Sequence, residues 1–281
     1  MSNNTELIYE ETVVKKTKNS KKKNKQFDSR FIIFLRGLIF PVVLIAVWEA
    51  AGIYGFVSET LLPRPSEIFM AFIDLWRNGN LLYHFQVSFL RAIAGFLIGG
   101  SLGLLAGLAV GFSNKVEHTL DPTMQMLRTI PTLAVIPLFI LWFGFGEVSK
   151  VLLIAKGAFF PLYVNAFLGI RSVDGKMFEV AKVLQYSKWK QITNLIIPSA
   201  LPNILLGLRL ALGAAWLALV AAELMGSSEG IGYLITDARQ FSQTTVVFVG
   251  IIIFAVFGKV SDSFVRLFER RLLKWQDSFK G

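Results

Sequence analysis

The chain of 281 residues has no cysteine and only two histidines, His84 and His118. The absence of cysteine excludes a disulfide framework and a thiolate metal site, and the two histidines belong to no cluster with metal-ligand spacing. The sequence also has no Ser-His-Asp arrangement and no convincing carboxylate pair. The only Gly-Lys pair, Gly258 and Lys259, is followed by Val260 within an apolar run, so it is not a phosphate-binding loop. We therefore predict a protein that is not an enzyme and has no cofactor.

Charge is scarce as well. Charged residues make up 17% of the chain, hydrophobic residues 54%, and the mean hydropathy is +0.56. Such a chain is too apolar for a soluble α/β domain, and its apolar runs of near 20 residues are typical of transmembrane helices. The net charge of +10 comes from basic blocks beside these runs. Such blocks favour contact with anionic headgroups over nucleic acid.

The apolar runs predict an all-α polytopic membrane protein with six transmembrane helices. The spans are expected at about residues 31–51, 88–112, 126–143, 148–170, 203–224 and 244–264. Residues 1–30 are expected to form a disordered basic tail, residues 31–275 the membrane domain, and residues 276–281 a C-terminal end. Lysine and arginine are concentrated in the tail, in the loop after the fourth span and after the sixth span. The positive-inside rule then predicts that both termini and this loop are cytoplasmic.

The second predicted span carries glycine at every fourth position from Gly95 to Gly111. Positions four apart lie on nearly one face of a helix, so these glycines form a groove without side chains. We expect another helix to pack closely against this groove.

The third and fourth spans contain residues that an isolated membrane helix tolerates poorly. Pro131 and Pro137 each remove a helix hydrogen bond, which predicts a broken helix lining a path. Lys156 and Asn165 lie within the fourth span, where a polar side chain needs a partner or a cavity. For Asn165 we expect a hydrogen bond to another helix, whereas the sequence leaves the partner of Lys156 open.

Three charged residues complete the candidates for a translocation path or gate. Arg128, at the inner end of the third span, suits an anion, although a snorkelling arginine is the more common case. Arg209 is expected at the cytoplasmic end of the fifth span, near headgroups or an acid. Glu223 is expected near the outer mouth, where packing, gating or docking is favoured over binding an anion. The full candidate set is Arg128, Pro131, Pro137, Asn165, Arg209 and Glu223.

The polar segment 178–202 lies between two apolar spans and is amphipathic. It predicts two short helical pieces, the second beginning near Ser187, with Pro198 and Pro202 closing the loop. The apolar faces comprise Phe178, Ala181 and Leu184 in the first piece, and Trp189, Ile192 and Ile196 in the second.

This segment, EVAKVLQYSKWKQITNLIIPSALP, resembles the EAA loop in permease subunits of bacterial ABC importers. The family pattern is Glu-Ala-Ala, a glycine a few residues later and a late Ile-x-Leu-Pro. The matching residues are Glu179, Ala181, Ile196 and Pro198, and mild departures occur at Val180 and Ile197. The larger departure is Gln185, which stands where the family usually has glycine. A left-handed backbone there would cost glutamine roughly 1 kcal/mol or more.

The resemblance extends over about residues 38–275. The segments MLRTIPTLAVIPLFILWFGFGEVSK, LGIRSVD, AAELMGSSEGIGYL and ARQFSQTTVV are similar to permeases of the aliphatic sulfonate, taurine and nitrate importers, most of all to the sulfonate permeases. The resemblance implies a bacterial cell-membrane subunit that moves a small anion by alternating access. It also implies a second permease copy, two cytoplasmic ATPases and an extracytoplasmic solute-binding protein as partners. With these partners, Glu179 would anchor the loop, by a helix N-terminal charge interaction or by a salt bridge to the ATPase. Ala181 would allow close approach, and Trp189 is a candidate anchor.

Two other classes compete with this interpretation. An ion-driven secondary transporter needs carboxylates at the bilayer midplane and usually an inverted repeat. The acids of this chain cluster at span ends instead. A membrane scaffold without transport would not need proline-broken spans.

Overall fold

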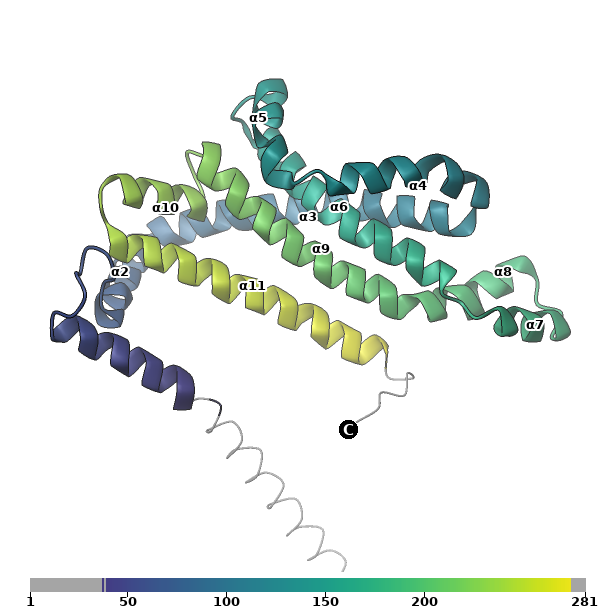
Figure 1. Cartoon of the computed structure of the whole chain (residues 1–281), viewed down its shortest axis with the longest axis horizontal. Helices are drawn as coiled ribbons and strands as arrows, with labels where there is room; N and C mark the ends of the chain where they lie inside the picture. Colours follow the sequence, from purple (N-terminus) through teal and green to yellow (C-terminus); the bar gives the residue numbers. More distant parts are fainter. Residues whose placement is uncertain (1–36, 38, 274–281) are drawn as a thin grey trace, which may run out of the picture. The chain divides into compact units, whose positions relative to one another are not determined.

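The computed structural model describes residue 37 and residues 39–273 (Figure 1). The expected tail 1–30 and the C-terminal end 276–281 lie outside the described residues. Within the described part the secondary structure is helical, with no strand, in agreement with the all-α prediction. The chain divides into two units, Met1–Glu67 and Ile68–Gly281.

The first unit contains the apolar helix Ile39–Ile53. Near the end of this helix, the carboxylate of Glu49 accepts hydrogen bonds from the amide and hydroxyl of Ser66, at 3.1 and 2.7 Å. Arg64 forms ion pairs with Glu67 at 2.6 Å and with Glu59 at 2.9 Å. These contacts fix the connection that leads into α2, Pro65–Arg77.

The second unit contains the remaining helices: α3 Asn80–Phe112, α4 Asn114–Thr129, α5 Thr132–Phe143, α6 Glu147–Arg171, α7 Gly175–Val183, α8 Lys188–Gln191, a π-helix Ile192–Ile196, α9 Ile197–Gly226, α10 Ile231–Gln240 and α11 Thr244–Leu272. Among the described residues, four helical segments are long and apolar enough to cross a membrane: α3, α6, the continuous α8–α9 and α11. The bent pair α4–α5 would be a fifth. The first predicted span is only partly described, so the count of six stays a prediction.

Helix α6 lies between α3 and α9, and its contact with α3 confirms the predicted glycine groove. A Cβ atom added at Gly99 or Gly103 would overlap the backbone of Ala155 or Phe159. At Gly107 the added atom would lie 2.5 Å from the carbonyl oxygen of Tyr163. The two backbones therefore meet along the stripe, where dispersion contacts are dense.

The opposite side of α6 packs against small residues of α9. Ile154, Ala158 and Leu162 of α6 form one buried cluster with alanines and Leu219 of α9. A Cβ atom at Gly157 would lie 2.9 Å from the carbonyl oxygen of Ala214. Both α3 and α9 therefore pack closely against α6.

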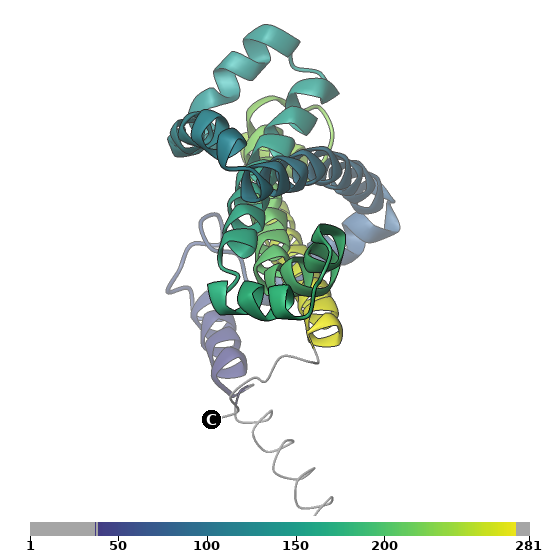
Figure 2. The same cartoon turned by 90° about the vertical axis from the view of Figure 1, so that its right-hand side faces the viewer.

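The third predicted span is broken, as the prolines suggested. Helices α4 and α5 are bent by 97° at the break that contains Pro131. Pro137 lies inside α5 and does not interrupt it. Figures 1 and 2 show α5 turning away from the direction of α4. The break follows from Pro131, because the residue before a proline is disfavoured in the helical conformation.

Close packing at the glycine stripe predicts a specific stability effect. Gly103→Ala is expected to destabilise the protein by about 1–3 kcal/mol, because the new methyl group overpacks against Phe159. Gly213→Ala in α9 is the matched control, since nothing lies within 4 Å of its added Cβ. This control should gain about 0.5–1 kcal/mol from helix propensity. Thermal unfolding of the detergent-solubilised protein measures both, and equal melting temperatures would contradict the packing argument.

Candidate functional site

Most of the predicted functional residues fall into three places in the second unit. Helices α7 and α8 lie at one end of α9, and α10 lies near the other end (Figure 1). A cavity lined by residues of α4, α5, α6 and α9 lies between these ends.

The first short helix of the loop, α7, ends in a Schellman turn at Gln185. Gln185 has a φ of 53°, in the left-handed region. Its amide donates to the carbonyl of Lys182 at 2.9 Å, and the amide of Tyr186 donates to the carbonyl of Ala181 at 2.9 Å. This pair of bonds defines the motif, whose left-handed position is usually glycine. Gln185 therefore adopts the left-handed backbone that glycine favours, at the position where related loops usually have glycine.

The loop exposes apolar side chains. Ala181 is 3% exposed, so the small residue of the motif faces inward. Glu179 is exposed and lies beyond the first turn of α7, which excludes the helix N-terminal interaction as its role. The exposed large apolar residues, which we call the α7–α8 patch, are Met177, Val180, Val183, Leu184 and Trp189.

The expectation that Pro198 and Pro202 close the loop is wrong. A five-residue π-helix containing Ile196 joins α8 directly to α9, and α9 continues through Pro202. Proline removes one helix hydrogen bond and its ring crowds the carbonyl four residues earlier. The wider π turn, in which Ile197 donates to the carbonyl of Ile192, gives Pro198 the room that it needs. The second short helix is therefore the start of the next membrane helix.

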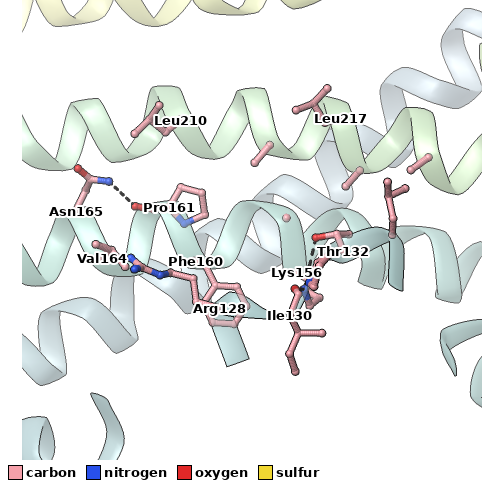
Figure 3. Close-up of a pocket in the computed structure, with 16 residues that line it drawn as sticks. Arg128, Ile130, Thr132, Lys156, Phe160, Pro161, Val164, Asn165, Leu210 and Leu217 are labelled. Atoms are coloured by element: carbon pink, nitrogen blue, oxygen red, sulfur yellow. Dashed lines mark hydrogen bonds between the residues drawn. The ribbon is translucent and has the colours of Figure 1, made fainter. Parts of the chain in front are cut away.

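The cavity has a volume of about 750 Å³ and a largely apolar wall (Figure 3). Three of the predicted path residues, Arg128, Pro131 and Asn165, line it. Pro137, Arg209 and Glu223 do not. Its other lining residues are Ile130, Thr132, Leu133, Lys156, Gly157, Phe160, Pro161, Val164, Leu210, Ala214, Leu217, Ala218 and Ala221.

Lys156 supplies a hydrogen-bond donor at the break between α4 and α5. Its ammonium donates to the carbonyl oxygen of Ile130 at 2.9 Å and lies 3.5 Å from the hydroxyl of Thr132, as the dashed lines in Figure 3 show. The carbonyl of Ile130 has lost its helical partner because α4 ends before Pro131. A charged donor within the membrane domain thus replaces the missing hydrogen bond.

Asn165 differs from its prediction. Its amide donates to the carbonyl of Pro161 at 2.8 Å, one turn earlier in the same helix, and not to another helix. The short amide side chain of Asn165 therefore bonds a carbonyl of its own helix, four residues earlier, as short polar side chains in helices can do.

Glu223 belongs to a buried charge cluster rather than to the cavity. It is 1% exposed and pairs with Arg91, which is 3% exposed, at 2.8 Å. Its carboxylate also accepts from the hydroxyl of Ser88 at 2.8 Å and from the amide of Gly232 at 2.9 Å. On its other side the guanidinium of Arg91 binds both carboxylate oxygens of Glu147, at 2.5 and 2.6 Å.

The cluster also requires glycine in the turn before α10. Gly230 has a φ of 108°, and a Cβ atom there would overlap the carboxylate of Glu223. Glu223 therefore ties α9 to α3 and to the start of α10. This arrangement fits packing or gating.

Arg209 meets an acid, one of the two partners that its position suggested. Its guanidinium pairs with Asp262 of α11 at 2.5 Å. Asp262 also pairs with Arg266 at 3.0 Å, so this contact links α9 to a basic surface of α11.

Sequence reasoning missed Arg91, Glu147 and Lys150 as members of one cluster. An arginine inside an apolar span signals a functional or structural role by itself, so Arg91 was detectable. Glu147 and Lys150, which pair at 3.1 Å, stand at a span end, where nothing in the sequence separates a paired charge from a solvated one.

The sequence of this helical chain matches the model of a known protein family. The family model for the inner membrane component of binding-protein-dependent transport systems matches residues 99–274. The chain belongs to this permease family. It is accordingly a membrane subunit of an ABC importer and not an enzyme, because ATP hydrolysis occurs in separate subunits of these systems.

Individual relatives agree with this assignment. The permease is 61% identical to the putative aliphatic sulfonates transport permease SsuC of Bacillus subtilis (strain 168), over 88% of this chain and 90% of the relative. It is 34% identical to the taurine transport system permease TauC of Escherichia coli (strain K12), over 83% and 86% of the two chains. Among solved structures, an amino acid ABC transporter shares the fold, with a TM-score of 0.60 and 18% identity over 71% of this chain and 98% of that chain.

The buried cluster of the permease predicts a stability effect. Arg91→Met should destabilise it by about 3–5 kcal/mol, because Glu223 remains buried without a cation. Adding Glu223→Gln to Arg91→Met removes the stranded charge and should recover part of the loss. Thermal unfolding in detergent compares the unaltered permease with these two variants. A double variant no more stable than Arg91→Met alone would contradict the charge argument.

Proposed function

We propose that this permease imports aliphatic sulfonates, with the loop 178–202 as the contact to its ATPase. The observation that carries the proposal is the exposed α7–α8 patch, whose Trp189 stands on the helix Lys188–Gly226 that runs without interruption into the membrane domain. The cargo follows from the relatives named as aliphatic sulfonates permeases, which are 61% and 45% identical.

The patch suits a groove of an ATPase subunit. Leu184 and Trp189 are 56% and 73% exposed, and exposed apolar groups of this size on short helices are typical of helix-in-groove recognition. Glu179 lies on α7 with no ion pair to a described residue, so its carboxylate is available to a basic partner. Trp189 is our candidate for the central anchor, because buried tryptophans often dominate binding energy at interfaces.

The assembly contains two copies of the permease, two ATPases on the cytoplasmic side and a solute-binding protein on the opposite side. Both termini are cytoplasmic in this arrangement. The basic residues of the loop support this orientation, since Lys182, Lys188 and Lys190 flank the patch. Closure of the ATPase pair would move α7 and α8, and with them α9, so that the cavity opens alternately to each side.

The proposal is tested by reconstitution into liposomes. The permease, its ATPase and its solute-binding protein should take up ethanesulfonate with ATP. Glu179→Ala should lower ATPase recovery on co-purification and uptake by about tenfold, the equivalent of one charged contact of about 1.4 kcal/mol.

Glu179→Asp, which keeps the charge, is the matched control and should retain most of both activities. Normal ATPase recovery and uptake by Glu179→Ala would refute the role of the loop. Uptake that needs an ion gradient and no ATP would instead favour a secondary transporter.

The turn at Gln185 predicts a graded effect on coupling. Gln185→Gly relieves the left-handed strain of about 1 kcal/mol and should leave ATP-driven uptake equal or higher. Gln185→Val places a β-branched residue at this φ and should lower ATPase recovery several-fold, with Gln185→Asn in between. Equal recovery for valine and glycine would show that this turn does not set the position of the patch.

A further inference from the structure

We propose that Arg128 and Lys156 form an anion-binding site in the cavity, which holds the sulfonate group of the cargo during its passage. This inference rests on the proposed function and specifies where within the permease the cargo is recognised.

The first argument is charge balance. Arg128 and Lys156 both line the cavity, whereas none of its described lining residues is acidic. The guanidinium of Arg128 makes no hydrogen bond or ion pair with any residue in the described part of the chain. Arg128 is exposed and Lys156 is half-buried, so an anion that enters the cavity can reach both cations. Beside the largely apolar wall the attraction is stronger than in bulk water, because the local dielectric is lower.

The second argument is the contrast with other cations of the membrane helices. Arg91, Arg171 and Arg209 each pair with a carboxylate, of Glu147 and Glu223, of Glu117 and of Asp262 respectively. Lys150 pairs with Glu147. Cations in spans are costly and normally neutralised, so two that share an acid-free cavity mark a place for an external anion.

The third argument is the donor capacity of Lys156. An ammonium has three N–H donors, and the contacts to Ile130 and Thr132 occupy two. The remaining donor is available to a sulfonate oxygen. The start of α5 also lies at the cavity, where Thr132 and Leu133 line it. The first amides of a helix lack helical partners and favour negative charge nearby.

The fourth argument is shape. A volume of about 750 Å³ lies in the range of about 300–1,000 Å³ typical of small-molecule sites. The residues that α9 contributes to the wall are all aliphatic: Leu210, Ala214, Leu217, Ala218 and Ala221. Polar groups on one side and aliphatic groups on the other match an alkyl chain with a charged head.

Because the chain has no cysteine, one introduced cysteine gives a unique probe of the site. We place it at Val164, which lines the cavity, in the assembled importer in nanodiscs of phosphatidylcholine. Two reagents are compared: anionic sulfonatoethyl methanethiosulfonate, itself a sulfonate, and cationic trimethylammonioethyl methanethiosulfonate. The measurement is the ratio of their labelling rates, read by mass spectrometry of this chain.

The anionic reagent should react faster, and the ratio should fall at least tenfold when Arg128→Gln and Lys156→Gln are added. Glutamine at 156 keeps a donor for the carbonyl of Ile130, so the hydrogen bond at the break between α4 and α5 can still form. Lys259→Gln is the matched control, because it removes a charge from α11 outside the cavity and should leave the ratio unchanged. Equal ratios with and without the two cations, or no labelling by either reagent, would overturn the proposal.

Two further arms separate the possible sources of the anion. Ethanesulfonate should slow labelling in phosphatidylcholine alone; slowing only when phosphatidylglycerol is present would assign the site to lipid headgroups and overturn the cargo role.

Uptake separates the two proposals. Sulfonate uptake that survives Arg128→Gln with Lys156→Gln refutes the site and leaves the proposed function standing. A cation-dependent labelling ratio without sulfonate uptake by the unaltered importer refutes the proposed cargo and, with it, the assignment of this site to sulfonates.

Discussion

The close approach of α3 to α6 is the contact on which the rest of the second unit depends. The glycine stripe brings the backbones together, and the small residues of α9 hold α6 from the other side. With α6 fixed, its polar side chains reach defined partners. Tyr163 donates to Asp121 of α4 at 2.6 Å, and Arg171 donates to Asn114 at 2.6 Å. Helix α4 is thus tied to α6 near its start and in its middle, and Lys156 holds the carbonyl just beyond its end.

The charged residues of this unit serve two different needs. Around Glu223 every charge has a partner, and the buried pair contributes to a defined geometry more than to net stability, since desolvation offsets much of the attraction. At the cavity, neither Arg128 nor Lys156 has an acidic partner among the described residues. Paired and unpaired charge lie on the same helix, because Glu147 and Lys156 both belong to α6. The central helix therefore connects a structural cluster with the place we assign to the cargo.

Much of this architecture was predictable because it depends on local sequence patterns. Glycines at every fourth position define a packing face, and a proline after a short polar helix defines a break. The loop could be recognised from the spacing of a few residues around Ala181. The position of glycine in related loops raised the left-handed turn at Gln185 only as a condition, and the φ of 53° shows it in the structure.

The failures concern long-range pairing and competition between local and tertiary effects. No periodicity indicates that Lys156 binds the carbonyl of Ile130, because the two residues lie 26 positions apart. Arg91 and Glu223 are 132 positions apart, and only the packing of α3 against its neighbours brings them together. Pro198 and Pro202 carry a strong local signal for helix termination. That signal was overridden by a π turn and by the packing of α9, in which Ala200 is fully buried.

The continuity from α8 into α9 changes how the loop behaves mechanically. Lys188–Gly226 spans 39 residues, about 58 Å of helix. A flexible connector after the loop would absorb a displacement at α8, but a stiff rod converts it into tilt. A tilt of only about 10° displaces one end of such a rod by about 10 Å relative to the other. The residues of α9 that line the cavity lie along this rod. The distance that each of them moves therefore depends on its position along the helix.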